Sequence, residues 1–178
     1  VYTQDNQTIV GTTVSGRDIP VSGIEESVGL YINTLPLIIE WDNENTVLQQ
    51  VEYIHQQITD INSNSFADLA GLQLDGKRLF HSLLVFENYP MPEPSGIISK
   101  DSLTPKLRYA VEKLDYPIGI TAYEQEDKLV ISLKSDREIS DREKANYNLG
   151  KIRLLLVELL ADLDKKHSGI STLTQAEY

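Results

Sequence analysis

The amino-acid sequence predicts a mixed α/β fold in which helices cover a sheet. Three observations support this prediction: β-branched or apolar runs bounded by glycine or proline, two long segments with apolar residues every three to four positions, and alternation of the two along the chain. The expected order is strand, strand, helix, strand, hairpin and helix, which is typical of a layered domain. A chain of 178 residues is long enough for one such domain with a substantial core.

The first two expected strands flank a loop rich in glycine. Residues 8–15 carry many β-branched side chains and end at Gly16, which predicts a strand. The loop of residues 16–29 holds three glycines and one proline, so we expect a constrained connection. Tyr31 to Trp41 is almost continuously apolar and predicts a strand buried on both faces. Pro36 within it predicts a bulge or an unpaired amide.

The next segment predicts a long helix followed by a short one. Thr46 and Gln49 have the spacing of a capping box. Apolar residues then recur at intervals of three and four to about residue 62, which indicates an amphipathic helix. We expect a short helix at 66–74, ended by the turn signal Asp75-Gly76.

A third buried strand is expected at 79–87 and a hairpin further along. Residues 90–105 contain four prolines between these elements, and we expect them to be the least ordered part of the chain. Residues 118–123 and 128–133 are two short strands around a polar turn, which predicts the hairpin.

The last expected element is a long helix. Ser140 and Glu143 form a second possible capping box at its start. A broad apolar face follows, made by Ile152, Leu155, Leu156, Leu159, Leu160 and Leu163. The polar tail from His167 is expected to fray.

The composition argues against several classes of partner. The formal net charge is −11, which disfavours nucleic acid because its binders need clustered Lys and Arg. The chain has no cysteine, which removes disulfides and thiolate metal sites and fits a cytoplasmic protein. No apolar run approaches the ~20 residues that cross a membrane, and the first residues do not resemble a signal peptide. The chain does not begin with Met, as we expect of a fragment.

No catalytic or metal-binding pattern stands out from the residues alone. There is no GxGxxG, P-loop or nucleophile elbow, and the three histidines follow no metal-ligand spacing. We expect His55 to be a partly buried structural residue, His81 to lie in the third strand without a catalytic role, and His167 to be exposed. The sequence therefore predicts no metal site.

Polar residues near the first loop are the more informative candidates. In Ser15-Gly16-Arg17, the glycine permits close backbone approach, and the guanidinium can either hold a substrate carboxylate or anchor the loop. Asn33 and Thr34 stand within an otherwise apolar strand. Because buried polar groups need partners, these two either tie down a neighbouring loop or face a solvated cavity.

Four segments, in order, resemble motifs of the condensation domains of nonribosomal peptide synthetases. GTTVSGR at 11–17 is similar to the family's strand and turn before its floor loop. VGLYINTLP at 28–36 resembles the motif (I/V)GxFxNT(L/Q), with Tyr31 at the aromatic position. NSNSFADL at 62–69 resembles the short helix of the family, although the His or Pro often found there is absent. LFHSLLVFENYP at 79–90 resembles the strand that ends in FENYP.

The resemblance implies one lobe of a two-lobed fold like that of chloramphenicol acetyltransferase. The two lobes of such domains enclose a tunnel, and a histidine of the motif HHxxxDG promotes attack of the acceptor amine on the donor thioester. This sequence has no HHxxxDG, so we expect the catalytic histidine in a missing N-terminal lobe and no catalytic residue in this chain. Residues 1–168 would be the C-terminal lobe, and residues 169–178 the start of a linker towards an adenylation domain.

The same resemblance assigns roles to individual residues. Those expected to line the tunnel or to fix its floor loop are Ser15, Gly16, Arg17, Gly29, Tyr31, Asn33 and Thr34. Those expected to contact the other lobe are Glu87, Asn88 and Tyr123. The hairpin of residues 118–133 would be the latch that reaches the other lobe. The Thr-Leu-Pro form of the second motif resembles peptide-bond-forming or acyl-starting domains rather than epimerases.

The expected function is support of amide-bond formation between carrier-tethered aminoacyl or peptidyl thioesters in peptide-antibiotic biosynthesis. The full synthetase would be the enzyme, and this chain alone would be inactive. Expected partners are the N-terminal lobe, donor and acceptor carrier proteins that carry phosphopantetheine, and an adenylation domain; no cofactor is expected to bind directly. The uncovered lobe surface predicts some self-association. Two alternatives stay open: a noncatalytic carrier-binding module, and a lobe of another acyltransferase of this fold.

Overall fold

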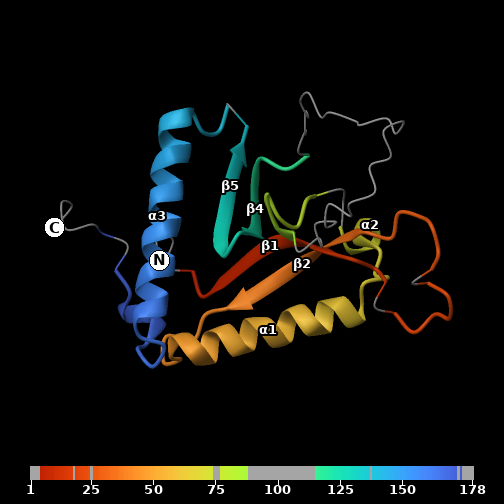
Figure 1. Ribbon diagram of the computed structural model, residues 1–178, viewed down its shortest axis with the longest axis horizontal. Helices are drawn as coiled ribbons and strands as arrows, with labels where there is room; N and C mark the ends of the chain where they lie inside the picture. Colours follow the sequence, from red (N-terminus) through yellow and green to blue (C-terminus); the bar gives the residue numbers. More distant parts are fainter. Residues whose placement is uncertain are drawn as a thin grey trace, which may run out of the picture.

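The computed structural model describes residues 5–17, 19–24, 26–73, 77–87, 115–136, 138–171 and 173. Within them, helices flank one sheet of five strands (Figure 1). The elements in chain order are β1 (Gln7–Val14), β2 (Asn33–Glu40), α1 (Val47–Ser63), α2 (Leu69–Leu72), β3 (Ser82–Glu87), β4 (Ile118–Gln125), β5 (Lys128–Ser135) and α3 (Arg142–Ala161), followed by the 3-10 turn His167–Gly169. The predicted α/β class and the hairpin are therefore confirmed. The proline-rich segment 90–105, Asn88 and the Asp75-Gly76 turn lie outside the described residues.

The sheet has the order β2-β1-β3-β4-β5. Its outer pairs, β1 with β2 and β4 with β5, are antiparallel, whereas β3 runs parallel to both β1 and β4. This mixed arrangement places β3, not β2, at the centre. The expectation that β2 is a central strand buried on both faces is wrong.

The burial of β2 shows why its apolar run was misleading. Leu35, Leu37 and Ile39 are buried, whereas Ile38 and Glu40 are exposed, which is the alternation of a strand with one covered face. The pairing with β1 passes through Pro36, opposite Gly11, without a break, so there is no bulge. An edge strand tolerates proline because only one side of its backbone is paired.

Helix α1 lies along β2 and is capped at its N-terminus as the sequence predicts (Figure 1). The Thr46 side chain accepts from the Gln49 amide, and the Gln49 side chain accepts from the Thr46 amide, so the capping box is confirmed. Val47 and Gln50 are buried, and the Gln50 side-chain amide donates to the Glu40 carbonyl at 2.9 Å. This bond fastens the first turn of α1 to the end of β2.

An aromatic cluster packs on β1 beside the start of β3. The Phe80 ring stacks on that of Tyr116 with centroids 5.1 Å apart, and Phe80 is 2% exposed. A Cβ placed on Gly11 would lie 2.2 Å from the Phe80 ring, so the ring occupies the space left by that glycine. The predicted third strand begins only at Ser82, and it is not buried throughout, because Leu84 and Phe86 are exposed.

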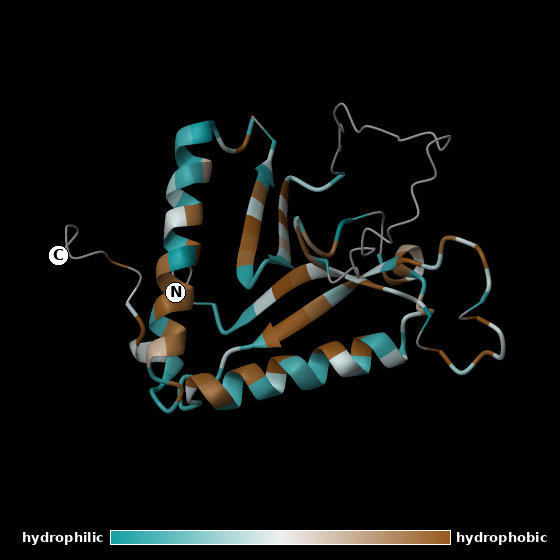
Figure 2. Ribbon diagram, in the orientation of Figure 1, coloured by the Kyte–Doolittle hydropathy of each residue, from teal (hydrophilic) through white to brown (hydrophobic). Residues whose placement is uncertain are grey.

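Helix α3 stands beside β5 and starts differently from the prediction (Figure 1). Its N-cap is Asp141, whose side chain accepts from the Lys144 amide at 2.8 Å. The predicted Ser140 capping box is wrong, because an aspartate one position later satisfies the same orphan amides. Its C-terminal half is the more apolar one (Figure 2). Of the predicted face, Leu160 and Leu163 are exposed, and Leu163 lies beyond the end of α3 at Ala161, so only part of that face is covered.

The histidines also differ from expectation. His81 is exposed and precedes β3, which begins at Ser82, so it does not lie in the strand. His55 is exposed rather than partly buried. His167 is half-buried, its ring contacts that of Trp41, and its Nε2 lies 2.6 Å from the Asp42 carbonyl oxygen. The chain therefore does not fray at His167. Ile170, three residues later, is buried as well.

Candidate functional site in the loop between β1 and β2

Arg17 organises the loop that joins β1 to β2. Its Nη1 donates to the carbonyl oxygens of Ile24 at 2.7 Å and Ser27 at 2.9 Å, and its Nη2 donates to that of Gly29 at 3.3 Å. A guanidinium carries five donors in a fixed planar fork, which suits it to hold several carbonyls at once. The side chain therefore closes the loop back onto the end of β1. Of the two roles open for Arg17, the structure shows loop anchoring.

Tyr31 packs beneath this anchor at the end of the loop. The Arg17 guanidinium lies over the Tyr31 ring, 4.5 Å from its centroid, in the geometry of a cation–π contact. The Tyr31 hydroxyl is hydrogen-bonded to the Ser27 hydroxyl. The aromatic position of the motif thus joins the same network as Arg17.

Two small residues make room for this packing. Gly16 has φ of +67°, and a Cβ there would lie 2.0 Å from the Tyr31 carbonyl oxygen. Only glycine adopts that conformation without strain and permits that approach. A Cβ on Gly29 would lie 3.2 Å from the Tyr31 ring, a tight contact. Ser15 accepts a hydrogen bond from the Arg17 amide at 3.2 Å, which turns the chain out of β1.

The anchored loop presents apolar side chains to solvent. Val28 is 100% exposed and Leu30 is 88% exposed, and Ile32 is exposed as well. Isolated exposed apolar residues are common, but here three are exposed at alternate positions of one short segment. Arg17 fixes the backbone at the start of this segment through its bonds to the Ser27 and Gly29 carbonyls.

Asn33 joins the start of β2 to the connection between α1 and α2. Its Nδ2 donates to the carbonyl oxygens of Ser65 at 2.9 Å and Ala67 at 2.8 Å, and its Oδ1 accepts from the Thr34 amide at 2.8 Å. Both amide protons and the carbonyl oxygen are therefore engaged within the chain. Of the two roles considered for Asn33, these bonds correspond to tying down a neighbouring segment.

The segment held by Asn33 leads into the short helix α2. Asp68 caps this helix by accepting from the Ala70 and Gly71 amides. The helix is shorter than predicted, because Gln73 is already extended. Ser65 is 3% exposed and its hydroxyl has no hydrogen-bond partner among the described residues.

The remaining predicted residues lie on the sheet. Thr34 is half-buried and stands directly opposite Thr13 in the β1–β2 register, so the two share a face. Glu87 and Tyr123 are adjacent in the β3–β4 register. The structure thus brings Glu87 and Tyr123 together, separately from the Arg17 network. The β4–β5 turn has positive φ at both Glu126 and Asp127, as tight hairpins require.

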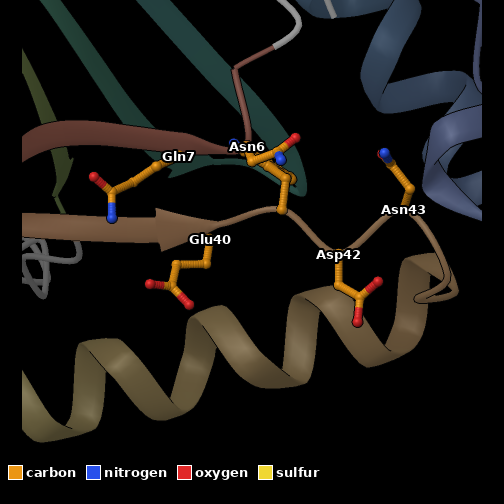
Figure 3. Close-up of a pocket in the computed structure, with 6 residues that line it drawn as sticks. Asn6, Gln7, Glu40, Asp42 and Asn43 are labelled. Atoms are coloured by element: carbon orange, nitrogen blue, oxygen red, sulfur yellow. The ribbon is translucent and has the colours of Figure 1, made fainter.

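Other potential sites are weaker. Within the described ranges, no group of three or more His, Cys, Asp or Glu is placed to hold a metal ion. A surface hollow of about 530 Å³ lies at the far end of β2, lined by Asn6, Gln7, Glu40, Trp41, Asp42 and Asn43. Figure 3 shows that the side chains it labels come from the ends of β1 and β2 and from the turn after β2, and that they do not converge on one point. Among the helices that the structure describes, none is long and apolar enough to span a bilayer.

The sequence does not predict the hydrogen-bond partners of Arg17 and Asn33. The carbonyl groups of Ile24, Ser27, Ser65 and Ala67 carry no sequence signal, because every residue has one. Only the family resemblance marks the polar run before α2, although an asparagine in an apolar strand indicates that its side chain needs a partner.

Comparison with known proteins places this geometry in a family. The family described as "Condensation domain" matches residues 1–178, and the chain belongs to that family. It is 38% identical over 164 residues to N-(5-amino-5-carboxypentanoyl)-L-cysteinyl-D-valine synthase of Amycolatopsis lactamdurans, covering 89% of this chain and 4% of that protein. It is 30% identical over 184 residues to bacitracin synthase 3 of Bacillus licheniformis, covering 99% and 3%.

Solved structures share the fold at low sequence identity. The first condensation domain of the CDA synthetase matches with a TM-score of 0.75 at 17% identity, over 97% of this chain and 39% of that one. A four-domain nonribosomal peptide synthetase bound to AMP and glycine matches with a TM-score of 0.73 at 16% identity, over 96% and 14%. The chain thus corresponds to about two fifths of the first of these chains. The predicted fold, one lobe of the two-lobed α/β fold, is confirmed.

Proposed function

We propose that this chain is the C-terminal lobe of a condensation domain and that it positions two carrier-tethered substrates for amide-bond formation. The observation that carries the proposal is the Arg17 network, which fixes the loop leading into the motif at 28–36. Holding two reactants in register replaces a bimolecular encounter by an intramolecular one, which is a large rate effect. Positioning of this kind needs a rigid scaffold, and the network supplies it.

The general base belongs to another part of the domain in this proposal. The sequence contains no two adjacent histidines, and His55, His81 and His167 are separated along the chain. Proton transfer needs a base within hydrogen-bond reach of the reacting amine. We therefore assign this chain no catalytic residue, and the isolated chain is inactive in amide formation.

The predicted site residues divide into two groups under this proposal. Ser15, Gly16, Arg17, Gly29 and Tyr31 shape the tunnel floor, and Asn33 fixes the short helix next to it. Thr34 lines the tunnel wall opposite Thr13. Glu87, Asn88 and Tyr123 contact the N-terminal lobe, and the β4–β5 hairpin is the latch. Val28, Leu30 and Ile32 are exposed in this chain, which supports the proposal that another part of the domain covers them.

The partners follow from the same assignment. They are the N-terminal lobe, a donor and an acceptor carrier protein with phosphopantetheine arms, and an adenylation domain that follows the linker at 169–178. Phosphopantetheine arrives on the carrier proteins, so no cofactor binds this chain directly. A cytoplasmic location remains a prediction. Without its partner lobe, the chain self-associates through the exposed apolar loop, and a clean monomer in sedimentation at high concentration would contradict that.

A split reconstitution tests the proposal. The chain is mixed with a separately produced N-terminal lobe that carries HHxxxDG, and amide formation from two loaded carrier proteins is followed by mass spectrometry. We expect product only when both parts are present, and none from the mixture when Arg17→Ala replaces the native chain. Product from the native chain alone would refute the positioning role. Carrier binding without any product in the complete mixture would favour the noncatalytic binding module.

A further inference from the structure

The segment that follows α3 returns to the start of α1 and binds there. We call residues 162–170 the C-terminal strap. Its backbone accepts from the first two amides of α1: Val47 donates to the Lys165 carbonyl at 2.9 Å, and Leu48 donates to the Leu163 carbonyl at 2.9 Å. The first four amides of a helix lack partners within the helix, and the strap supplies acceptors for two of these amides. Thr46 and Lys166 also pair as an isolated antiparallel bridge.

Side chains of the strap form hydrogen bonds to the turn between β2 and α1. His167 Nε2 lies 2.6 Å from the Asp42 carbonyl oxygen, and the Ser168 hydroxyl donates to the Asn43 carbonyl at 3.0 Å. The His167 amide donates to the Asn45 carbonyl at 3.2 Å. Lys166 pairs with Glu44 at 2.6 Å, but both side chains are exposed, so this ion pair adds little.

The same turn also holds the beginning of β1. The Trp41 amide donates to the Asn6 carbonyl at 2.8 Å, and the Trp41 indole donates to the Thr8 hydroxyl at 2.8 Å. The Trp41 indole also contacts the His167 ring, with centroids 5.6 Å apart and the ring planes tilted by 56°. Trp41 therefore stands between the first strand and the strap.

We propose that this corner is an anchor that fixes where the chain enters and leaves the domain. Because Asn6 and the strap are held by the same turn, polypeptide that precedes β1 and polypeptide that continues beyond Ile170 start from neighbouring, fixed points. Whatever is attached at the two ends is then oriented relative to β2, whose other end carries the Arg17 loop. The buried Ile170 shows that the strap holds to its last residue.

The absence of cysteine in the chain makes a distance measurement straightforward. Spin labels are attached to Glu52→Cys, exposed on α1, and to Leu173→Cys, just beyond the strap. Pulsed electron spin resonance then gives the distribution of label separations in the full 178-residue chain. We expect one narrow distribution. A broad distribution in this otherwise native chain would overturn the proposal by itself.

Variants test which contacts hold the anchor. The combination K166A/H167A/S168A removes the side-chain contacts of the strap, and we expect it to broaden the distribution at least two-fold and to speed exchange of the Val47 and Leu48 amides roughly ten-fold. The matched control is Lys165→Ala, because Lys165 takes part through its backbone carbonyl. If the triple variant loses its circular dichroism signal, H167A alone is compared. An unchanged distribution in folded H167A and triple variants would contradict the anchor.

This inference does not depend on the proposed function. The distance measurement needs no carrier protein, second lobe or catalysis, so its failure would leave the amide-forming role untouched. Failure of the split reconstitution would likewise leave the anchor standing.

Discussion

Replacing Arg17 by alanine tests the site most sharply in this chain alone. The substitution removes two hydrogen bonds of 2.7 and 2.9 Å to partly buried carbonyls, one of 3.3 Å to an exposed carbonyl, and the contact with Tyr31. Hydrogen bonds to charged groups contribute about 1.5–3 kcal/mol each, and an exposed cation–π contact about 0.5–1 kcal/mol. Water replaces part of this because the loop is at the surface. We therefore expect a loss of about 2 kcal/mol in the free energy of unfolding.

Arg17→Lys keeps the positive charge but removes the planar guanidinium, so it separates the contribution of the charge from that of the hydrogen-bond geometry. A lysine ammonium is a point charge that cannot hold the three carbonyls in one plane, so we expect about half of the loss. Urea unfolding followed by circular dichroism measures both variants. Amide exchange at Ile24 and Ser27 adds a local readout, because both amides donate within the loop. A local loss of 2 kcal/mol corresponds to roughly thirty-fold faster exchange there.

The matched control is Arg153→Ala, which removes an exposed arginine from α3. Exposed substitutions of this kind usually change stability by less than about 0.5 kcal/mol. If Arg17→Ala unfolds at the same urea concentration as Arg153→Ala and exchanges its loop amides at the native rate, the anchoring role is refuted.

Three further substitutions probe the packing around the site, each measured by urea unfolding. Asn33→Ala removes three hydrogen bonds and is expected to cost about 2 kcal/mol; an unchanged midpoint would contradict the bond pattern. Gly11→Ala drives a Cβ into the Phe80 ring and is expected to cost about 1–3 kcal/mol, with Phe80→Leu in the same chain restoring part of it. Gly16→Ala combines positive φ with a backbone clash, whereas Gly23→Ala has positive φ and open space. Gly23→Ala should cost about 1 kcal/mol and Gly16→Ala clearly more; equal losses would argue against the approach to Tyr31.

The sequence predicted local structure well where periodicity and capping decide it. The helix after Thr46 and the β4–β5 hairpin were found because spacings of three and four, or alternation around a polar turn, depend on nearby residues only. The Ser140 cap failed for a local reason too: Asp141 offers the same chemistry one residue later. Boundaries of this kind are decided by small differences between neighbouring side chains.

The position of β2 in the sheet was not predictable from its own residues. An apolar run is equally compatible with a central strand and with an edge strand that has one helix over it. The topology that decides between them depends on β3 pairing with β1, more than 65 residues away in the chain. The exposed Ile38 belongs to a run that the sequence cannot divide into covered and uncovered faces.

The candidate site was predicted in its residues but not in its connections. Glycine at 16 and polar groups at 33 and 34 indicated an unusual loop. The family resemblance assigned these positions to one site. The structure adds that Arg17 reaches three carbonyls and that Asn33 reaches the segment before α2. Backbone acceptors lack residue identity, so no pattern of side chains could have named them.

The most direct test of the positioning role is single-turnover amide formation in the complete condensation domain. The native domain is compared with Arg17→Ala and with the Arg153→Ala control, using saturating loaded carrier proteins. The account predicts that Arg17→Ala slows amide formation by at least ten-fold, while the pH dependence set by the histidine of the other lobe keeps its midpoint. An unchanged rate, or a shifted midpoint, would contradict the claim that this lobe positions substrates and leaves proton transfer to its partner.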